Sequence, residues 1–358
     1  MSRARLNNDY HDVIVVGAGF GGMYALHKFR DHLGLKVKVL EQGDGVGGTW
    51  YWNRYPGAHC DVPVLEYQYS FNKELAEEYS PKFKTVMAAQ PEIEEYANFV
   101  KDKFNLAKDI QFDTKVVRCK YDDQSKLWSI FTNTNEEFRC HYFVTCVGCL
   151  SEPNVPDIKG MDAFKGELHF TSKYPKAGVD FTNKKVGLIG TGSSGIQSIP
   201  EIAKQCKQLY VFQRTPQYTL PASNTPISEN YRNKLLSNFE KVREFNHTSA
   251  GGFGGYGAIT SEVQTSAIPS RLQRSKFPKI LSMTMKEREE YLEKYGFSSF
   301  FRFSDLSANM EANQAACDLF AKQIRKVVKD QDTATKLIPT NQPFGCKRQV
   351  IDSGYYQT

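Results

Sequence analysis

The chain has 358 residues, of which 40% are hydrophobic and 24% are charged, and its formal net charge at pH 7 is +6. This length allows two domains and a sizeable core, and the composition is ordinary for a soluble globular protein. The mild positive charge is not gathered into a basic stripe or tail, which argues against a nucleic-acid partner.

The first twelve residues are polar, and the apolar run that follows them is short. Because this run covers only Val13–Val16 before the glycines begin, we expect neither a signal peptide nor a membrane span. Eight cysteines in such a chain predict reduced thiols and a cytoplasmic location. Cys146 and Cys149 form a CxxC pair, but no helix start lies there to lower a thiol pKa, so we expect no redox role. The histidines lack metal-ligand spacing, and we expect no metal site.

A dinucleotide-binding unit is predicted near the start of the chain, in the order strand, glycine turn, helix, strand and acid. The strands and helix are expected at residues 12–16, 36–40 and 23–33. The glycines of the G-x-G-x-x-G turn are Gly17, Gly19 and Gly22, and the acid is Glu41. Such glycines permit a tight turn, the helix N-terminus binds a pyrophosphate, and the acid accepts hydrogen bonds from ribose hydroxyls.

An aromatic-rich stretch, GGTWYWNRYPGAHCD at residues 47–61, follows the first unit. Loops are normally small and polar, whereas this one carries planar side chains, a Tyr-Pro-Gly turn and the carboxylate of Asp61. Two interpretations stay open. The flat side chains suit a flat, conjugated ligand that the Pro-Gly backbone approaches closely. Alternatively, the aromatic residues staple a loop that closes a domain.

The middle of the chain predicts a helix, a small meander and a linker. Residues 91–106 have the apolar spacing of an amphipathic helix, for which we expect a packing role. Strand-like runs at residues 114–121, 127–132 and 137–147 predict an antiparallel meander inserted in the first nucleotide domain. Residues 151–160 carry two prolines and are typical of a linker.

A second dinucleotide-binding unit is predicted around GTGSSG, with Gly190, Gly192 and Gly195 between a strand at 186–189 and a helix at 196–206. Arg214 follows the next strand, 22 residues after the second glycine, where Glu41 stands in the first unit. An acid repels a ribose phosphate, whereas an arginine binds it. The first unit should therefore take FAD and the second NADPH. The alternative is two structural Rossmann units, with an arginine at this position by chance.

The remaining chain is expected to be mainly helical. Candidate helices lie at residues 231–245, 286–295 and 308–329. The glycine–aromatic motif GGFGGYG at residues 251–257 predicts an irregular connection, with a mobile lid as the alternative. Lys347 and Arg348 follow a Pro-Phe-Gly turn near residue 358, and such a pair is usually solvated.

At this point the chain resembles the Baeyer–Villiger monooxygenases, flavoproteins related to phenylacetone and cyclohexanone monooxygenases, over nearly all of residues 10–358. The most specific match is Gly48-x-Trp50-x4-Tyr55-Pro56-Gly57-x3-Asp61. The glycine turns, QRTP at 213–216 and the KR pair followed by DSGYY match as well. The resemblance implies an enzyme that uses FAD and NADPH as cofactors together with dioxygen. It also implies oxygen insertion next to the carbonyl of a small-molecule ketone, giving an ester or lactone through a flavin peroxyanion.

The resemblance also implies roles for individual residues. Arg348 would stabilise the anion without giving up its proton, and Asp61 would orient Arg348. The residues implied to bind FAD are Gly17, Gly19, Gly22, Glu41, Thr49, Trp50, Trp52, Asp61 and Tyr67. The residues implied to bind NADPH are Gly190, Gly192, Ser193, Ser194, Gly195, Arg214, Thr215 and Lys347.

The expected fold class is therefore α/β, with two Rossmann-like dinucleotide-binding domains, a helical insert and a small antiparallel β-meander. We expect an FAD-binding domain at residues 1–152, with its meander at 114–147, and the first part of an NADPH-binding domain at 153–226. The helical insert should span 227–330, and residues 331–358 should return to the NADPH domain with the catalytic arginine. We expect a monomer.

The chain departs from the family pattern in two respects. In the family's second fingerprint, FxGxxxHxxxW, Phe170 stands in place of the histidine and Tyr174 in place of the tryptophan, while His169 lies one residue early. Because a tyrosine at that place is typical of related flavin N- and S-oxygenases, amine or sulfide oxygenation is an alternative. Relatives also continue well beyond residue 358. A second alternative is therefore a truncated nucleotide-binding remnant that retains FAD weakly and oxidises NADPH without coupled oxygenation.

Overall fold

The computed structural model describes residues 5–222, 224–249, 252, 254–260, 277–295, 300 and 302–358. The chain divides into two compact units. Unit 1 comprises Met1–Tyr55 and Gln90–Gly178, and unit 2 comprises Pro56–Ala89 and Val179–Thr358. The chain therefore passes from unit 1 to unit 2 within the aromatic-rich stretch at residues 47–61.

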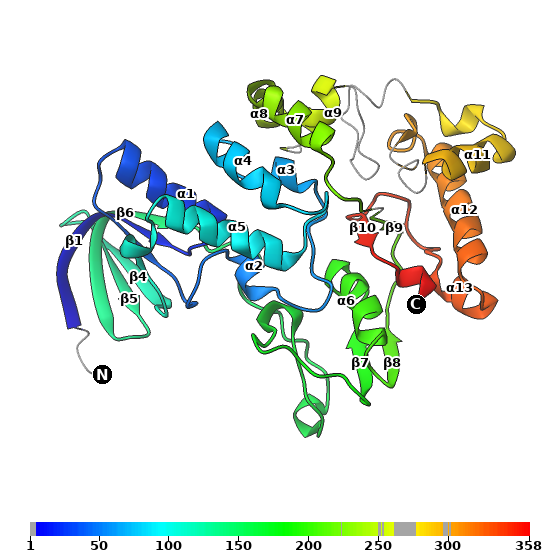
Figure 1. Ribbon diagram of the computed structural model, residues 1–358. Helices are drawn as coiled ribbons and strands as arrows, with labels where there is room; N and C mark the ends of the chain where they lie inside the picture. Colours follow the sequence, from blue (N-terminus) through cyan, green and yellow to red (C-terminus); the bar gives the residue numbers. More distant parts are fainter. Residues whose placement is uncertain are drawn as a thin grey trace. The chain divides into compact units, whose positions relative to one another are not determined.

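Unit 1 is built on a six-stranded sheet with the order β3-β2-β1-β6-β5-β4 (Figure 1). Its strands are β1 (Arg5–Val16), β2 (Val37–Leu40), β3 (Ile110–Gln111), β4 (Val116–Asp122), β5 (Leu127–Thr132) and β6 (Glu136–Thr145). Strand β1 is parallel to both β2 and β6, whereas β4, β5 and β6 pair in an antiparallel manner. The predicted meander is confirmed, and its last strand also belongs to the parallel part of the sheet.

Both faces of the parallel part of this sheet are buried. Val13 and Val15 of β1 pack with Met23 and Leu26 of α1 (Phe20–His27), while Ile14 faces the opposite side. Residues of α5 (Gln90–Lys103) add to the first face. Burial on two faces explains why the end of β1, residues 13–16, is a continuous apolar run without alternation.

The helix after the first glycine turn begins earlier and ends sooner than expected. It starts at Phe20, and a π-helical turn, Lys28–His32, follows it. The Arg30 guanidinium lies in that turn and donates to Asp109 and to the main-chain oxygens of Phe104 and Asn105. These contacts fix the end of the helix next to the segment that enters β3.

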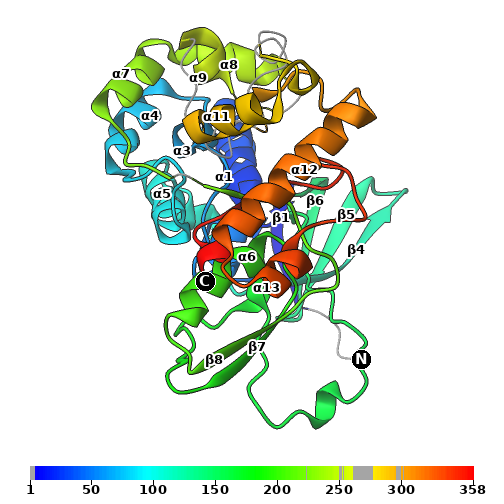
Figure 2. The ribbon, with the colours of Figure 1, turned by 90° about the vertical axis from the view of Figure 1, so that its right-hand side faces the viewer.

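Unit 2 contains the second strand, turn, helix and strand that the sequence predicts. Strands β7 (Lys185–Ile189) and β8 (Gln208–Phe212) are parallel, and α6 (Ser193–Ala203) connects them and packs on them (Figure 2). A second parallel pair joins β9 (Thr219–Pro221) to β10 (Val350–Asp352). The helices before this region are α3 (Val64–Tyr67) and α4 (Lys73–Tyr79).

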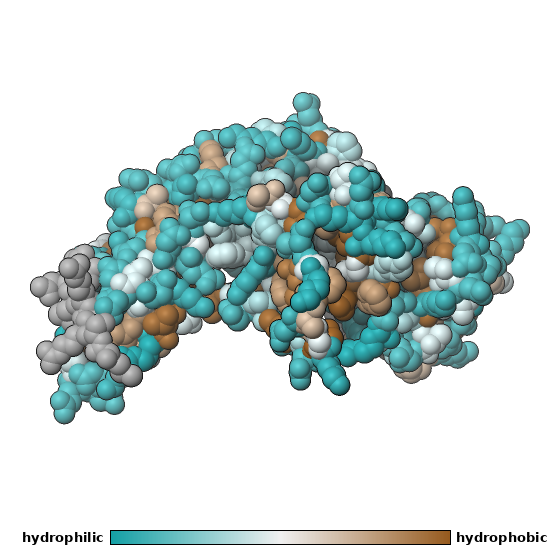
Figure 3. All heavy atoms as spheres, turned by 90° about the horizontal axis from the view of Figure 1, so that it is seen from below, coloured by the Kyte–Doolittle hydropathy of each residue, from teal (hydrophilic) through white to brown (hydrophobic). Residues whose placement is uncertain are grey.

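Apolar side chains of the β7–β8 sheet are exposed. Ile189 is 72% exposed and Phe212 is 57% exposed. Figure 3 shows apolar residues at the surface of the molecule among the hydrophilic ones. In parallel sheets such residues are normally covered on both faces.

The later part of unit 2 is helical, as expected. Its helices are α7 (Glu229–Ser237), α8 (Phe239–Thr248), α9 (Gly255–Thr260), α11 (Met285–Tyr295), α12 (Met310–Val327) and α13 (Gln331–Leu337). The single helix predicted over residues 231–245 is wrong, because Asn238 separates α7 from α8. The Asn238 side chain donates to the Lys234 carbonyl oxygen at 2.8 Å and so competes with the helical hydrogen bond. Helix α12 begins where the Asn309 side chain accepts from the backbone of Glu311 and Ala312.

The glycine–aromatic motif differs from its predicted form. Gly251 and Phe253 lie outside the described residues, but from Gly255 the chain forms α9 instead of an irregular connection. One carboxylate oxygen of Glu66 accepts from the backbone N–H groups of Gly254 at 3.0 Å and Tyr256 at 3.4 Å. A carboxylate from a distant segment therefore caps this helix.

Candidate functional site

The first glycine turn lies between β1 and α1 and leaves no room for side chains. A Cβ atom at Gly17, where φ is +99°, would lie 2.5 Å from the Cys146 carbonyl oxygen, and one at Gly22 would lie 1.8 Å from the Gly17 oxygen. The turn therefore requires glycine at both positions. The main chain passes tightly into α1, whose first N–H groups have no intrahelical acceptors and suit a phosphate.

Glu41 follows β2 and is 5% exposed. Its two carboxylate oxygens accept from the N–H groups of Ala18 at 2.6 Å and Gly43 at 2.8 Å. Burial raises the pKa of Glu41, and these backbone hydrogen bonds act in the opposite direction. Because an ionised carboxylate offers about four lone-pair positions, Glu41 retains acceptor capacity toward a sugar hydroxyl.

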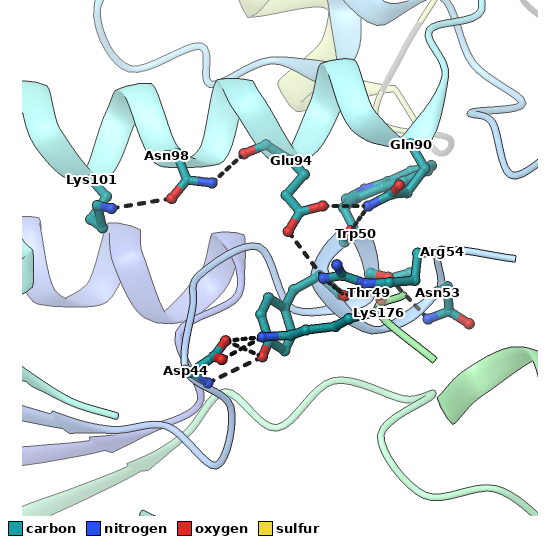
Figure 4. A network of polar contacts seen from close by, with 11 residues as sticks. Asp44, Thr49, Trp50, Asn53, Arg54, Gln90, Glu94, Asn98, Lys101 and Lys176 are labelled. Carbon is teal, nitrogen blue, oxygen red and sulfur yellow. Dashed lines mark hydrogen bonds and ion pairs between the residues drawn. The ribbon is translucent and has the colours of Figure 1, made fainter. Parts of the chain in front are cut away.

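Polar side chains of α5 hold the aromatic-rich stretch against unit 1 through hydrogen bonds (Figure 4). The Gln90 amide donates to the Trp50 carbonyl oxygen, and Arg54 Nε donates to the Tyr51 carbonyl oxygen at 2.8 Å. Glu94 accepts from both Gln90 at 2.7 Å and Arg54 at 3.1 Å. These contacts hold the short helix α2 (Thr49–Trp52) against α5.

The stapled residues are largely enclosed in protein. Trp50 is 9% exposed and Tyr51 is 6% exposed, whereas Thr49 is exposed and Trp52 is half-buried. The interpretation in which aromatic residues close a domain therefore applies to Trp50 and Tyr51. Thr49 and Trp52 keep surface that a ligand can reach.

Lys176, which lies shortly after the second fingerprint, joins the same network. Lys176 forms an ion pair with Asp44 and lies 4.9 Å from the centre of the Tyr51 ring, and the Tyr51 hydroxyl donates to Asp44. The hydrogen bond from Lys176 lowers the pKa of Asp44. Lys176 thus contacts the loop that precedes α2, as Figure 4 shows.

The second fingerprint, which departs from the family pattern, lies just before Lys176. The ring of the exposed His169 lies 6.2 Å from that of Tyr174. Phe170 precedes a 3-10 turn, Thr171–Lys173. The Tyr174 hydroxyl is buried without a hydrogen-bond partner among the described residues, and burial raises its pKa.

The second glycine turn is tightly packed at Gly195 but uncrowded at Gly190 and Gly192. A Cβ atom at Gly195 would lie 2.2 Å from the Gly190 carbonyl oxygen, so glycine is required there. At Gly190 and Gly192 no described atom lies within 4 Å of such a Cβ position. Ser193 and Ser194 form the first turn of α6 and are half-buried. The start of α6 is therefore uncrowded at Gly190 and Gly192, and N–H groups at a helix N-terminus suit a phosphate.

The cations predicted to read the ribose phosphate are exposed. Arg214 and Thr215 follow β8, and Lys347 lies shortly before β10. Within the described part of the chain, neither Arg214 nor Lys347 has an ion-pair partner. Both charges are consequently available to a dianion.

Asp61 and Arg348 come together in unit 2. Arg348 Nη2 lies 2.9 Å from Asp61 Oδ2, and the side chains are 76% and 13% exposed, respectively. Burial raises the pKa of Asp61, while Arg348, His59 and Gln197 act in the opposite direction. The sequence placed these two residues in one site, and the structure brings their side chains into contact.

Gln197 is a site residue that the sequence reasoning missed. Its side chain is on α6, and the residue is 3% exposed. The amide nitrogen donates to Asp61 Oδ1 at 3.2 Å and to the His59 carbonyl oxygen at 3.1 Å. A long polar side chain between the apolar Ile196 and Ile199 was the signal that could have identified it.

The side chains of the described residues include no group of three or more His, Cys, Asp or Glu residues arranged to hold a metal ion. No described helix is long and apolar enough to cross a membrane.

The two glycine turns, each between a parallel strand and a helix, define a protein with two dinucleotide-binding folds. The profile of the flavin-binding monooxygenase-like family matches residues 10–226. The chain therefore belongs to the flavin-binding monooxygenase-like family.

The individual relatives agree with the resemblance predicted from the sequence. The chain is 40% identical to cyclohexanone 1,2-monooxygenase of an Acinetobacter species, over 97% of this chain and 61% of that protein. It is 38% identical to phenazine N-monooxygenase PhzNO1 of Lysobacter antibioticus, over 99% and 62%. A solved structure of oxidised steroid monooxygenase bound to NADP matches with a TM-score of 0.82 and 40% identity, over 98% of this chain and 64% of that one. The chain thus spans about three fifths of the length of these relatives.

Proposed function

We propose that the chain belongs to an FAD- and NADPH-dependent monooxygenase that inserts one oxygen atom of dioxygen next to the carbonyl of a small ketone. The product is an ester or a lactone. The observation that carries this proposal is the 2.9 Å ion pair between Asp61 and Arg348, residues that the family fingerprint and the KR pair identify separately. The 40% identity to a cyclohexanone monooxygenase supports the same substrate class.

FAD suits the first glycine turn and Glu41, which lie in unit 1. The turn of Gly17, Gly19 and Gly22 admits no side chains at Gly17 and Gly22, which suits close approach of a pyrophosphate. Glu41 keeps acceptor capacity for the ribose. We assign Thr49, Trp50, Trp52, Asp61 and Tyr67 to the flavin part, within an FAD-binding domain at residues 1–152. For the buried Trp50 we assign an enclosing role around the flavin.

NADPH fits the second glycine turn. The open approach at Gly190 and Gly192 suits a pyrophosphate, together with Ser193, Ser194 and Gly195 at the start of α6. Arg214, Thr215 and Lys347 would bind the ribose phosphate, because a guanidinium pairs strongly with a dianion. The proposed NADPH domain comprises residues 153–226 and 331–358, on either side of the helical insert at 227–330.

When bound, FAD reduced by NADPH supplies the activation of dioxygen. Arg348 would stabilise negative charge that develops beside it, because a guanidinium stays protonated and keeps its charge. Asp61 accepts a hydrogen bond from Arg348 Nη2 and so fixes the direction of the remaining guanidinium N–H groups. Because the Asp61 side chain is only 13% exposed, solvent screens this ion pair less than it would a pair between two exposed side chains.

A substrate panel tests the reaction type. The purified protein is incubated with FAD, NADPH, and matched cyclic ketones, thioethers and tertiary amines, and products are identified by mass spectrometry. We expect esters or lactones from the ketones. Amine or sulfide oxides without any ester would overturn the ketone assignment.

N-oxygenation is the second candidate. It is favoured by the 38% identity to a phenazine N-monooxygenase and by Tyr174 in the second fingerprint. An oxidant that transfers oxygen to a nitrogen or sulfur lone pair acts as an electrophile and needs no stabilised anion. Arg348→Ala should therefore reduce ketone oxygenation much more than amine or sulfide oxygenation.

A further inference from the structure

We propose that Gln197 is a positioning residue that fixes Asp61, and through it Arg348, relative to the second glycine turn. The inference deepens the proposed function, because it rests on the roles assigned to Asp61 and Arg348. It assigns Gln197 no contact with a cofactor or a substrate.

The side chain of Gln197 is placed to hold two acceptors at once. Its amide nitrogen lies 3.2 Å from Asp61 Oδ1 and 3.1 Å from the His59 carbonyl oxygen. Both partners are acceptors only, so the NH2 group is the part of the amide that must face them. The residue is 3% exposed, so water competes little for these bonds. Gln197 and Arg348 therefore bind different oxygens of one carboxylate.

The main chain of Gln197 also fixes the position of the Pro-Gly turn that precedes Asp61. Gly57 has a φ of +78°, and a Cβ atom there would lie 2.2 Å from the Gln197 carbonyl oxygen. The Pro-Gly turn therefore packs directly on α6, and only glycine allows this approach. His59 Nδ1 lies 2.6 Å from the Gly57 carbonyl oxygen, and the Cys60 N–H donates to Ala88 at 2.9 Å. The turn that carries Asp61 has little freedom to shift along the helix.

Helix α6 also connects Gln197 to the second glycine turn. Helix α6 begins at Ser193, one helical turn before Gln197. At its start, Gly195 packs so closely on the Gly190 carbonyl oxygen that a Cβ would lie 2.2 Å away. Further along, α6 contacts β10, the strand that follows Arg348. One rigid helical turn thus connects the predicted pyrophosphate site to the Asp61 carboxylate.

The electrostatic surroundings of Asp61 make this role measurable. The groups that act on Asp61 are the Arg348 guanidinium, the His59 imidazole and the Gln197 amide, all of which lower its pKa against the raising effect of burial. The neighbouring Cys60 thiol is held neutral, because burial raises its pKa to about 12. Removing the Gln197 donor leaves a desolvated carboxylate with one partner fewer, so the pKa of Asp61 must rise further.

The test replaces Gln197 with a side chain of similar length that cannot donate. Gln197→Met retains the packing volume, and Gln205→Met makes the same change at an exposed residue just beyond α6. Asp61 is titrated by carboxyl carbon NMR in the protein without cofactors, and its signal is assigned by comparison with Asp61→Asn. We expect an upward shift of about half a pH unit to one unit in Gln197→Met, since one hydrogen bond is lost, and no shift in Gln205→Met.

A second variant separates positioning from packing. Gln197→Glu places another carboxylate beside Asp61. Because like charges repel, this variant should raise the pKa of Asp61 more than Gln197→Met does. An Asp61 titration that is unchanged in both Gln197 variants would overturn the inference. A second result would also overturn it: Gln197→Met no longer folds cooperatively, while Gln197→Glu folds and leaves the pKa of Asp61 unchanged. Gln197 would then serve packing alone.

The titration also distinguishes this inference from the proposed function. It needs neither FAD, NADPH nor a ketone, so a protein that oxygenates amines leaves the result intact. If ketone oxygenation is established and Gln197→Met titrates as the parent does, only the positioning role fails. With the role established, Gln197→Met should also move the acidic limb of the pH–rate profile upward by the same amount.

Discussion

Asp61 and Arg348 are 287 residues apart in sequence, yet Arg348 Nη2 donates to Asp61 Oδ2 at 2.9 Å. Asp61 follows the Pro-Gly turn that packs on α6, and Arg348 precedes β10, which also contacts α6. One helix therefore sets the positions of both partners. The arrangement explains how a fingerprint turn and an isolated Lys-Arg pair contribute to one site.

Removal of the Arg214 charge should weaken NADPH binding selectively. Arg214→Ala should raise the NADPH dissociation constant by about 10-fold or more, since a charge-assisted pair with the ribose phosphate is lost. Binding of NADH, which lacks that phosphate, should be nearly unchanged. The measurement is isothermal titration or fluorescence quenching, with Lys207→Ala as a control for the loss of an exposed cation. Equal losses for both nucleotides would show that Arg214 does not read the phosphate.

The Gly57 turn should tolerate no side chain. Gly57→Ala combines a φ of +78° with a Cβ that would lie 2.2 Å from the Gln197 carbonyl oxygen, so we expect it to lose roughly 2–4 kcal/mol of unfolding free energy. Gly34→Ala is the matched control, because φ is +67° but no described atom lies within 4 Å. The control should lose only about 1 kcal/mol through backbone strain. Similar losses for the two variants in urea denaturation would contradict the close packing on α6.

Glu66 should make stability depend on pH in a defined direction. Burial raises the folded-state pKa of Glu66 above the ordinary value of 4.5, so the folded protein favours the neutral acid. The contribution of Glu66 to stability is therefore greatest at pH values below 4.5 and decreases as pH rises through the raised folded pKa. Glu66→Gln removes this dependence while keeping an oxygen that can cap α9.

Urea denaturation across this pH range compares the parent with Glu66→Gln. The parent should lose stability relative to the variant as pH rises from below 4.5 to neutral, whereas Glu74→Gln, at an exposed position, should follow the parent throughout. A parent that gains stability relative to Glu66→Gln over the same interval would reverse the sign and refute the assignment.

Local patterns made much of the fold predictable. The two glycine turns carry their own geometric requirement, and the turn residues around 122–126 and 133–135 separate strands that pair as an antiparallel meander. The position of Arg214 relative to Glu41 also follows from the repeat of one strand–turn–helix–strand unit. Each of these features is encoded within a few tens of residues.

Features that depend on distant partners were not predictable. The cap that Glu66 provides for α9 joins residues about 190 positions apart, and nothing near GGFGGYG indicates it. The break between α7 and α8 depends on the Asn238 side chain, which donates to the Lys234 carbonyl oxygen and not to solvent. Gln197 required knowledge of which face of α6 meets the Pro-Gly turn. Burial of Trp50 beneath Gln90 likewise depends on α5, which follows it by 40 residues.

The most direct test of the Asp61–Arg348 account is the yield of ester from a cyclic ketone per NADPH consumed, measured by mass spectrometry for the parent, Arg348→Ala and Arg348→Lys. We expect the parent to form ester. Arg348→Ala should lose about 100-fold or more of ketone oxygenation, as found when a group that stabilises a developing anion is removed. Arg348→Lys should recover little, because an ammonium lacks the planar fork that Asp61 orients. Ester formation by Arg348→Ala at the parent's rate would contradict the account.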